Sequence, residues 1–153
     1  MEAGAMTTPS GSDPYELRRF VDAQSPVYRQ VVSELSSGRK RTHWMWFVFP
    51  QIAGLGLSAM AQRFAIKSKR EAEAYLAHDV LNPRLVECTR LVMAASEKNI
   101  QDILGSPDDM KFRSSMTLFD ALSKQKIFAE AIGTFYPEGP DPSTLRILRA
   151  LSD

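Results

Sequence analysis

The amino-acid sequence predicts an all-α protein: a compact, single-domain orthogonal bundle of about seven to nine short helices. Helix-start signals recur, because Ser or Asp precedes Pro at several positions. In several segments apolar residues recur three or four positions apart, which is typical of amphipathic helices. No two alternating runs bounded by hairpin turns predict paired strands. The four Ser/Asp-Pro starts are Asp13-Pro14, Ser25-Pro26, Ser106-Pro107 and Asp141-Pro142.

Capping residues and glycines give the order of the expected helices. The one strand-like run, Trp44 to Phe49, has no partner strand, so we expect a buried helix ended by Pro50. Ser68 and Glu71 form a capping box, and Asp79 is expected to cap the helix that follows. The expected segments are Asp13–Ala23, Ser25–Gly38, Trp44–Phe49, Ser58–Phe64, Ser68–His78, Asp79–Ala95, Asn99–Gly105, a helix from Ser106, and Asp141–Leu151.

Length and charge exclude several classes of protein. The chain has 153 residues, which fits one domain over residues 13–153, after an expected disordered tail over residues 1–12 in which Met6 is an alternative start. With 19 Lys and Arg against 18 Asp and Glu, the net charge of +1 argues against a bulk nucleic-acid binder and a polybasic membrane tether. No apolar run reaches membrane-span length, and no secretory signal is visible. We therefore expect a cytoplasmic protein, monomeric or weakly dimeric, with no membrane partner.

The few cysteines and histidines limit metal chemistry. Cys88 is the single cysteine, so neither an intrachain disulfide nor a Cys-based zinc site can form. His43 and His78 are the two histidines, which argues against a His-rich metal site. We expect no metal and no cofactor.

The segment of residues 38–58, GRKRTHWMWFVFPQIAGLGLS, gathers cations, both tryptophans and glycines. Cations beside aromatic rings can hold an anion that carries a planar ring, because the cations bind phosphate and the rings stack on a base. His43 could act as a general acid or base, since its ordinary pKa lies near neutrality. The alternative is a buried aromatic core beside a solvated basic turn. The candidate ligand-binding residues here are Lys40, Trp44, Trp46, Gln51 and Ser58.

A second segment, SPDDMKFRSSMTLF at residues 106–119, carries a polar stripe on a predicted helix. Lys111 lies three and four positions from two serines, so these side chains share a face. Serine and threonine are weak choices for a helix interior, because their hydroxyls compete for backbone hydrogen bonds. A hydroxyl-lined pocket wall explains them, and so does close packing of another helix. The candidates are Asp108, as a catalytic residue, and Lys111, Ser114, Ser115 and Thr117, as ligand-binding residues.

These segments, together with EAEAYLAHDVLNPRL, resemble the motifs of a bacterial and fungal family of uncharacterised all-α proteins that genome annotation often mislabels as calpastatin. The resemblance runs from about Asp13 to Leu148. It implies a compact helical fold, a cytoplasmic location and no assigned activity, and nothing here looks like a protease inhibitor.

The order of the motifs is also similar to the NADAR superfamily, helical enzymes that cleave N-glycosidic bonds of ADP-ribose-type substrates. No catalytic residue of that superfamily matches a position here. The similarity would imply that Lys40 and Lys111 hold phosphates, that Trp44 or Trp46 stacks on the base, and that His43 or Asp108 positions water.

Two functional hypotheses follow. The first is a site for a small phosphorylated or nucleotide-like ligand, with N-glycosidic hydrolysis as its enzymatic form. It predicts one pocket lined jointly by Lys40, His43, Trp44 and the Lys111–Ser115 stripe. The second is a non-enzymatic helical interaction module, with Trp46, Phe47 and Phe49 partly on an exposed apolar patch.

Overall fold

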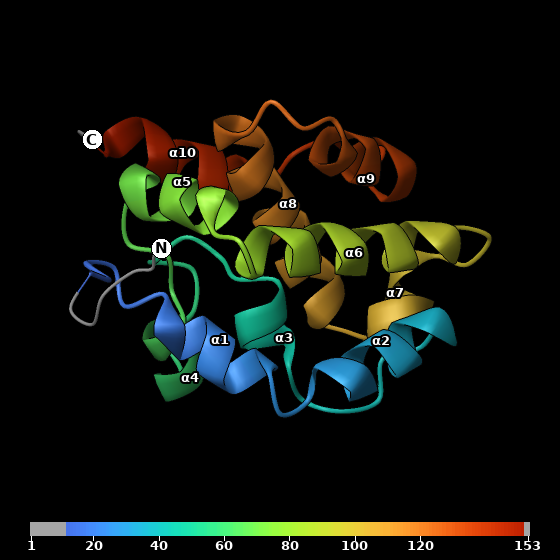
Figure 1. The fold of residues 1–153 in the computed structure, drawn as a ribbon. Coiled ribbons are helices and arrows are strands. Elements are labelled where there is room, and N and C mark those ends of the chain that lie inside the picture. Colours follow the sequence, from blue (N-terminus) through green and yellow to red (C-terminus); the bar gives the residue numbers. More distant parts are fainter. Residues whose placement is uncertain (1–11, 152–153) are drawn as a thin grey trace.

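Helix α8 forms the centre of the molecule, a computed structural model that describes residues 12–151 (Figure 1). Eight consecutive residues of α8, from Phe112 to Phe119, are buried, and the helix packs against α5, α7, α9 and α10. The ten helices of the described residues are α1 (Arg18–Gln24), α2 (Tyr28–Ser36), α3 (Met45–Val48), α4 (Ala59–Arg63), α5 (Lys69–Ala77), α6 (Leu81–Ala94), α7 (Ile100–Leu104), α8 (Asp108–Leu122), α9 (Ile127–Phe135) and α10 (Pro142–Ala150). The predicted all-α class is confirmed, with one helix more than expected.

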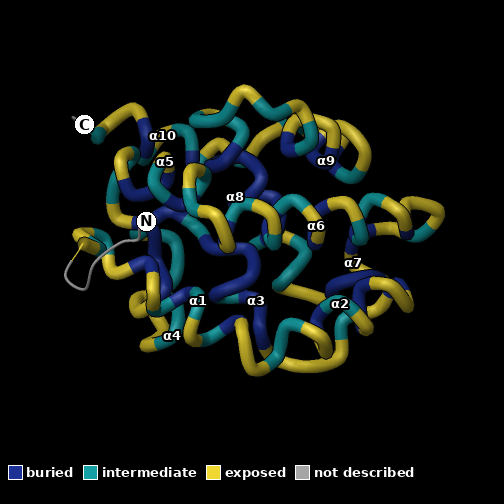
Figure 2. Tube along the Cα trace, viewed as in Figure 1, coloured by how far each residue is buried: buried dark blue, intermediate teal, exposed yellow. Residues whose placement is uncertain are grey.

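Aromatic rings connect the helices through the core, which Figure 2 shows as buried segments along the middle of the chain trace. Tyr75 of α5 lies edge-on to Phe20 of α1, with ring centroids 5.1 Å apart, and 5.2 Å from Phe119 of α8. Phe49, just after α3, meets Phe112 of α8 at 4.9 Å. Offset and edge-on pairs at these distances stabilise a fold beyond the area that they bury. The Phe49–Phe112 contact brings the two segments singled out in the sequence together.

Local capping chemistry explains where four of the ten described helices begin. The side chains of Ser58, Ser68, Asn99 and Asp141 each accept a hydrogen bond from a backbone N–H in the first turn of the following helix. Gly38 and Gly105, with φ of 73° and 81°, follow the ends of α2 and α7. These features were predicted, and the structure confirms them.

Three expectations about helices were wrong. Asp79 does not cap α6: the Nδ1 atom of His78 accepts from the N–H groups of Val80 and Leu81 instead. Asp13 accepts from the N–H groups of two residues, but α1 begins only at Arg18, because Glu16 has a φ of 53°. Helix α9 was not predicted, since no side-chain cap precedes it.

The expected disordered tail lies outside the described residues, apart from Ser12. No helix in residues 12–151 combines the length and the apolar character needed to span a membrane.

Candidate functional site

Glu34 of α2 organises the loop between α2 and α3. Its buried carboxylate accepts hydrogen bonds from the N–H groups of Arg41 and Thr42, from the Thr42 hydroxyl, from the Gln30 amide and from the indole N–H of Trp44, at 2.6 to 3.0 Å. Burial by itself would raise the pKa of this carboxyl group, but the hydrogen bonds outweigh burial and lower the pKa to about 2. The loop that carries the basic run is therefore held by a charged acceptor.

Asp108, at the first position of α8, lies between two lysines. Its Oδ2 is 3.0 Å from the Nζ of Lys40, and its Oδ1 is 3.7 Å from the Nζ of Lys111. Each ammonium group also lies over an indole ring, Lys40 at 5.1 Å from the ring centroid of Trp44 and Lys111 at 5.6 Å from that of Trp46. The prediction that the Trp-rich stretch and the serine-bearing helix meet in space is thus correct.

A recess opens on the Trp46 side of this cluster. Its enclosed cavity has a volume of about 20 Å³, which is room for about one water molecule. Lys111 is the one charged residue of its lining. Most of the other lining residues are apolar, but Phe49, Ile52 and Phe64 expose almost none of their surface, so much of the lining is polar. The lining residues come from α3, the following loop, α4 and α8: Met45, Trp46, Phe49, Gln51, Ile52, Gly54, Gly56, Ala61, Phe64, Ala65 and Lys111.

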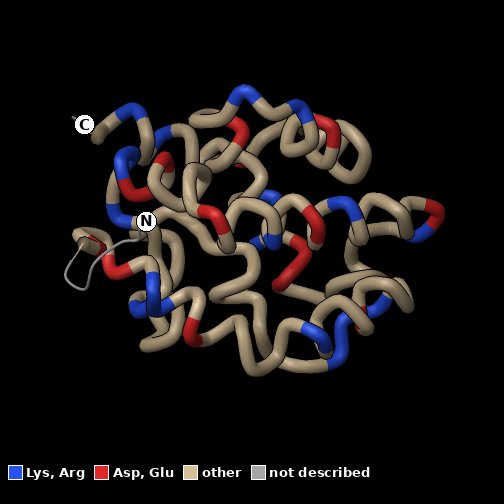
Figure 3. Tube along the Cα trace, viewed as in Figure 1, with Lys and Arg blue, Asp and Glu red and all other residues tan. Residues whose placement is uncertain are grey.

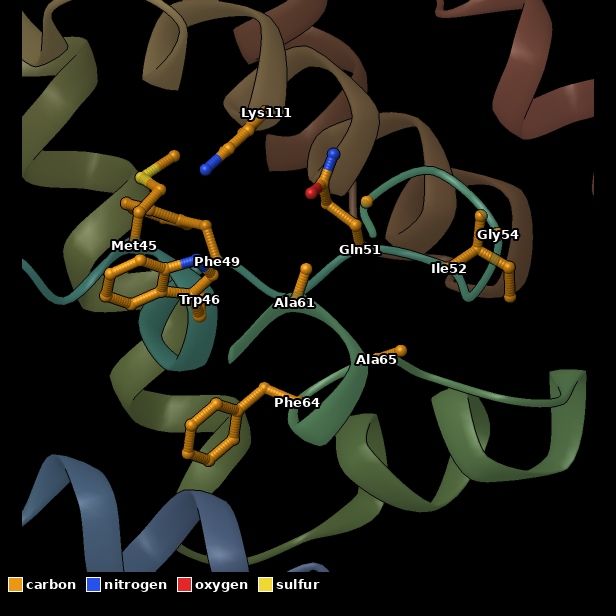
Figure 4. A pocket seen from close by; sticks show the side chains of 11 residues that line it. Met45, Trp46, Phe49, Gln51, Ile52, Gly54, Ala61, Phe64, Ala65 and Lys111 are labelled. Atoms are coloured by element: carbon orange, nitrogen blue, oxygen red, sulfur yellow. The ribbon is translucent and has the colours of Figure 1, made fainter. Parts of the chain in front are cut away.

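Three polar side chains surround this recess (Figure 4). The Lys111 side chain extends from α8 toward the side chains on α3, and the Gln51 amide points to the same end of the recess. The indole N–H of Trp46 and the Gln51 amide make no hydrogen bond with any described residue, although both side chains are half-buried. The distance from Lys111 to Asp108 exceeds hydrogen-bond length. These groups are free to bind something that enters the recess.

Backbone contacts fix the two walls of the recess. An isolated parallel bridge pairs Ile52 with Ile66, so the loop after α3 runs beside the segment after α4. Gly56 packs closely on α4, where an added Cβ would come within 2.6 Å of the Cβ of Ala61. Gly54, with a φ of 105°, has a backbone conformation that side-chain-bearing residues rarely adopt. The glycines therefore serve the shape of this loop.

The hydroxyls of α8 are used elsewhere. Ser114 donates to Asp141 Oδ2 at 3.0 Å, and the Thr117 hydroxyl accepts from the Asp141 N–H at 2.9 Å. Together they hold the N-cap of α10 against α8, which is the close-packing alternative for these residues. Ser115 is fully buried, and its hydroxyl has no partner among the described residues.

The joint pocket that was expected needs correction. Of the residues named for it, only Lys111 lines the recess. Trp44 is 1% exposed with its N–H bound to Glu34, and Lys40 is bound to Asp108. His43 is exposed and does not line the recess. Ser58 is the N-cap of α4.

Sequence reasoning missed part of the site. The far wall comes from Ala61 and Phe64 of the α4 region, which carry no polar signal and reach the recess only through the Ile52–Ile66 bridge. Glu34 was also missed, because its partners in the following loop lie seven to ten positions away, beyond the spacing of helical neighbours.

A wider surface groove beside basic residues is a weaker candidate for the site. Figure 3 shows that Lys and Arg residues and Asp and Glu residues are both spread over the molecule. A surface groove of about 450 Å³ lies beside Arg39, Lys40 and Lys98, but Asp102 lies in it too, and Lys98 donates to the Gly38 carbonyl at 2.7 Å. No three His, Cys, Asp or Glu side chains cluster to hold a metal ion within residues 12–151.

Comparison with known proteins gives one family and one close structure. The model of a family described as "Protein of unknown function (DUF1810)" matches residues 14–148. The crystal structure of the conserved hypothetical protein Rv1873 from Mycobacterium tuberculosis is 52% identical in sequence, with a TM-score of 0.88; the match covers 90% of this chain and 99% of that chain. No curated protein matches the chain. The resemblance to an uncharacterised helical family is confirmed, while the similarity to the NADAR superfamily stays a prediction.

Proposed function

Because the chain belongs to the DUF1810 family, which is described as of unknown function, we propose a function from the site itself: the protein binds a small anionic molecule in the recess beside Lys111. The observation that supports this proposal is the convergence of Lys111, Trp46 and Gln51 on one small cavity without mutual hydrogen bonds.

Water reaches the polar atoms of this recess, because none of them is among the buried polar atoms that lack a partner. A ligand would take the place of that water and offer an acceptor to each donor. The Lys111 side chain is 29% exposed, so burial has already removed part of its water shell. A cation whose water is partly removed attracts an anion more strongly than an exposed cation does. The recess therefore favours an anion that also accepts hydrogen bonds.

The size of the recess limits how a phosphorylated or nucleotide-like ligand could bind. A cavity of about 20 Å³ has room for one atom the size of a water oxygen, so at most one oxygen of the charged group can enter and the remainder would have to lie outside. Trp44, the second indole, is sealed in the core and is unavailable to stack on a base.

N-glycosidic hydrolysis has less support than binding. Both carboxylate oxygens of Asp108 face ammonium groups, and His43 lies outside the recess. A general base needs a lone pair within hydrogen-bond reach of the attacking water. We therefore propose binding and assign no hydrolytic step.

The interaction-module hypothesis needs an exposed apolar patch, but the residues that it named are mostly buried. Phe47 and Phe49 are 7% and 1% exposed and belong to the core, and Trp46 lines the recess. What remains is Leu57, which is 86% exposed in the loop beside the recess. A single exposed leucine is ordinary for a folded protein.

A thermal-shift screen tests the proposal. Nucleotides, sugar phosphates, carboxylic acids and their neutral analogues are compared on the wild type, on Lys111→Met and on the control Lys124→Met, an exposed lysine that does not line the recess. At about 100 times its dissociation constant a ligand adds about 2.7 kcal/mol, which is a shift of roughly 5–10 °C for a domain of this size. We expect an anion to shift the wild type and the control but not Lys111→Met. A screen in which no anion shifts the wild type would overturn the proposal.

A further inference from the structure

We infer that the outer face of α6 docks a second copy of this chain in an antiparallel, two-fold symmetric contact. Helix α6 packs on α2, α5 and α9, and its inner face is buried. Figure 1 shows it running across the molecule between α2 and α9. Its opposite face is exposed, and no helix of the described residues covers it.

Four exposed residues form a straight stripe along this face, which we call the α6 stripe. They are spaced four, three and four positions apart, which places them on one side of the helix. The half-buried apolar side chains of Val86 and Leu91 lie beside them, and an open surface groove of about 460 Å³ runs over this part of the helix. The α6 stripe consists of Pro83, Glu87, Arg90 and Ala94.

The order of residue types in the α6 stripe is self-complementary. Along the chain it reads apolar, acid, base, apolar. When two antiparallel copies face each other about a two-fold axis between Glu87 and Arg90, each Glu87 lies opposite the partner's Arg90, and each Pro83 lies opposite the partner's Ala94. A parallel contact would place like charges opposite each other, which opposes binding. The α6 stripe therefore fits a second copy in one orientation.

Both central charges are available for such a contact. Glu87 and Arg90 lie three positions apart on one helix, yet neither forms an ion pair with the other or with any further described residue. One carboxylate oxygen of Glu87 accepts a hydrogen bond from the Tyr28 hydroxyl of α2, which holds the side chain, and the second oxygen has no partner among the described residues. A guanidinium group of a second copy can bind that oxygen.

The size of the contact sets its strength. The α6 stripe covers about three helical turns, so the contact is smaller than the roughly 1,600 Å² that a stable interface buries. Burial of Val86 and Leu91 on both copies favours association, and the two Glu–Arg pairs fix the register. The result is a weak dimer, which forms at about millimolar protein and separates on dilution.

Charge reversal at the two central positions tests this contact. Sedimentation equilibrium measures the apparent mass of the wild type, of Glu87→Arg, of Arg90→Glu and of an equal mixture of these two variants, up to about millimolar protein. Glu73→Arg in α5 and Arg146→Glu in α10 reverse exposed charges outside the α6 stripe and are the matched controls. Circular dichroism and the melting temperature show whether each variant is folded.

We expect the apparent mass of the wild type to rise with concentration from 17.1 kDa toward twice that value. Glu87→Arg alone and Arg90→Glu alone should stay monomeric, because each places like charges opposite each other. Their mixture should regain the association of the wild type, since each central position of one variant then faces the opposite charge in the other. Both control variants should associate as the wild type does.

Three outcomes would overturn the inference. A wild type that keeps the monomer mass up to the highest concentration would leave this face to a partner of another kind, and this measurement decides even where a variant is unstable. Folded α6 variants that associate as the wild type does would place the contact on another surface. Folded α6 variants that stay monomeric when mixed would contradict the antiparallel pairing.

Discussion

Replacing Glu34 by Gln is expected to destabilise the fold by about 3 kcal/mol at pH 7. The hydrogen bonds that the buried carboxylate accepts lower its pKa from 4.5 to about 2. Each pKa unit corresponds to about 1.4 kcal/mol, so the charged form contributes about 3 kcal/mol to folding. Glutamine keeps one acceptor but turns an amide NH₂ toward groups that themselves donate, among them the Thr42 hydroxyl.

The pH dependence of the same substitution has a definite sign. Because the pKa of Glu34 is lower in the folded state than in the unfolded state, its contribution to the free energy of unfolding is fully present above about pH 4.5 and is lost as the pH falls toward 2. Urea unfolding between pH 7 and pH 2, followed by tryptophan fluorescence, measures this free energy. The wild type should lose about 3 kcal/mol more than Glu34→Gln across that interval, and the exposed control Glu73→Gln should follow the wild type. Parallel stability curves for the wild type and Glu34→Gln would refute this reasoning.

Three other substitutions test packing and capping. Gly56→Ala should cost about 1–3 kcal/mol in urea unfolding, since its Cβ would lie 2.6 Å from that of Ala61; Gly133→Ala in α9, with no atom within 4 Å, is the control and should stabilise by about 0.5–1 kcal/mol. Ser115→Ala should leave the free energy of unfolding unchanged or raise it by about 1 kcal/mol, because the buried hydroxyl has no partner among the described residues, and a clear loss would contradict that assignment. Burial lowers the pKa of His78, whose neutral Nδ1 accepts hydrogen bonds at the start of α6. The stability that this neutral side chain adds is therefore present above about pH 6.5 and is lost at lower pH. The melting temperature of the wild type should drop more steeply between pH 7.5 and 5.5 than that of His78→Asn, because asparagine keeps a cap but does not titrate.

The fold could be predicted from the sequence where its signals are local. Ser58 and Ser68 each cap a helix by bonding an N–H three positions ahead, so a four-residue window contains all the chemistry. His78 shows where local reading fails, because it and Asp79 are both able to cap α6, and the backbone path decides between them. Helix α9 has no side-chain cap, and besides its neighbour α8 it packs on α6, which lies far from it in the sequence.

The candidate site was predictable in part. Cations and indoles in one segment and a lysine on another helix predicted a joint pocket with Lys111 beside Trp44, whereas the structure places Lys111 over Trp46. The hydroxyls of Ser114 and Thr117 misled because their partner, Asp141, lies 27 and 24 positions along the chain. A hydroxyl that lines a pocket and one that anchors a distant helix have the same sequence signature. Only the position of α10 distinguishes them.

The two lysines of the cluster also looked equivalent in the sequence, and their surroundings give them different roles. Lys40 is nearly buried, so removing it would leave the Asp108 carboxylate without its closest counter-charge in a poorly hydrated place. Asp108 in turn lies at the first turn of α8, where a negative charge favours the helix. Lys40 is thus part of the fold, and by neutralising Asp108 it leaves the Lys111 ammonium available. The Lys111 ammonium lies 3.7 Å from Asp108 Oδ1, beyond hydrogen-bond length, so it can turn to an anion in the recess while Lys40 keeps Asp108 neutralised. Lys40 therefore serves the fold, and Lys111 serves the proposed site.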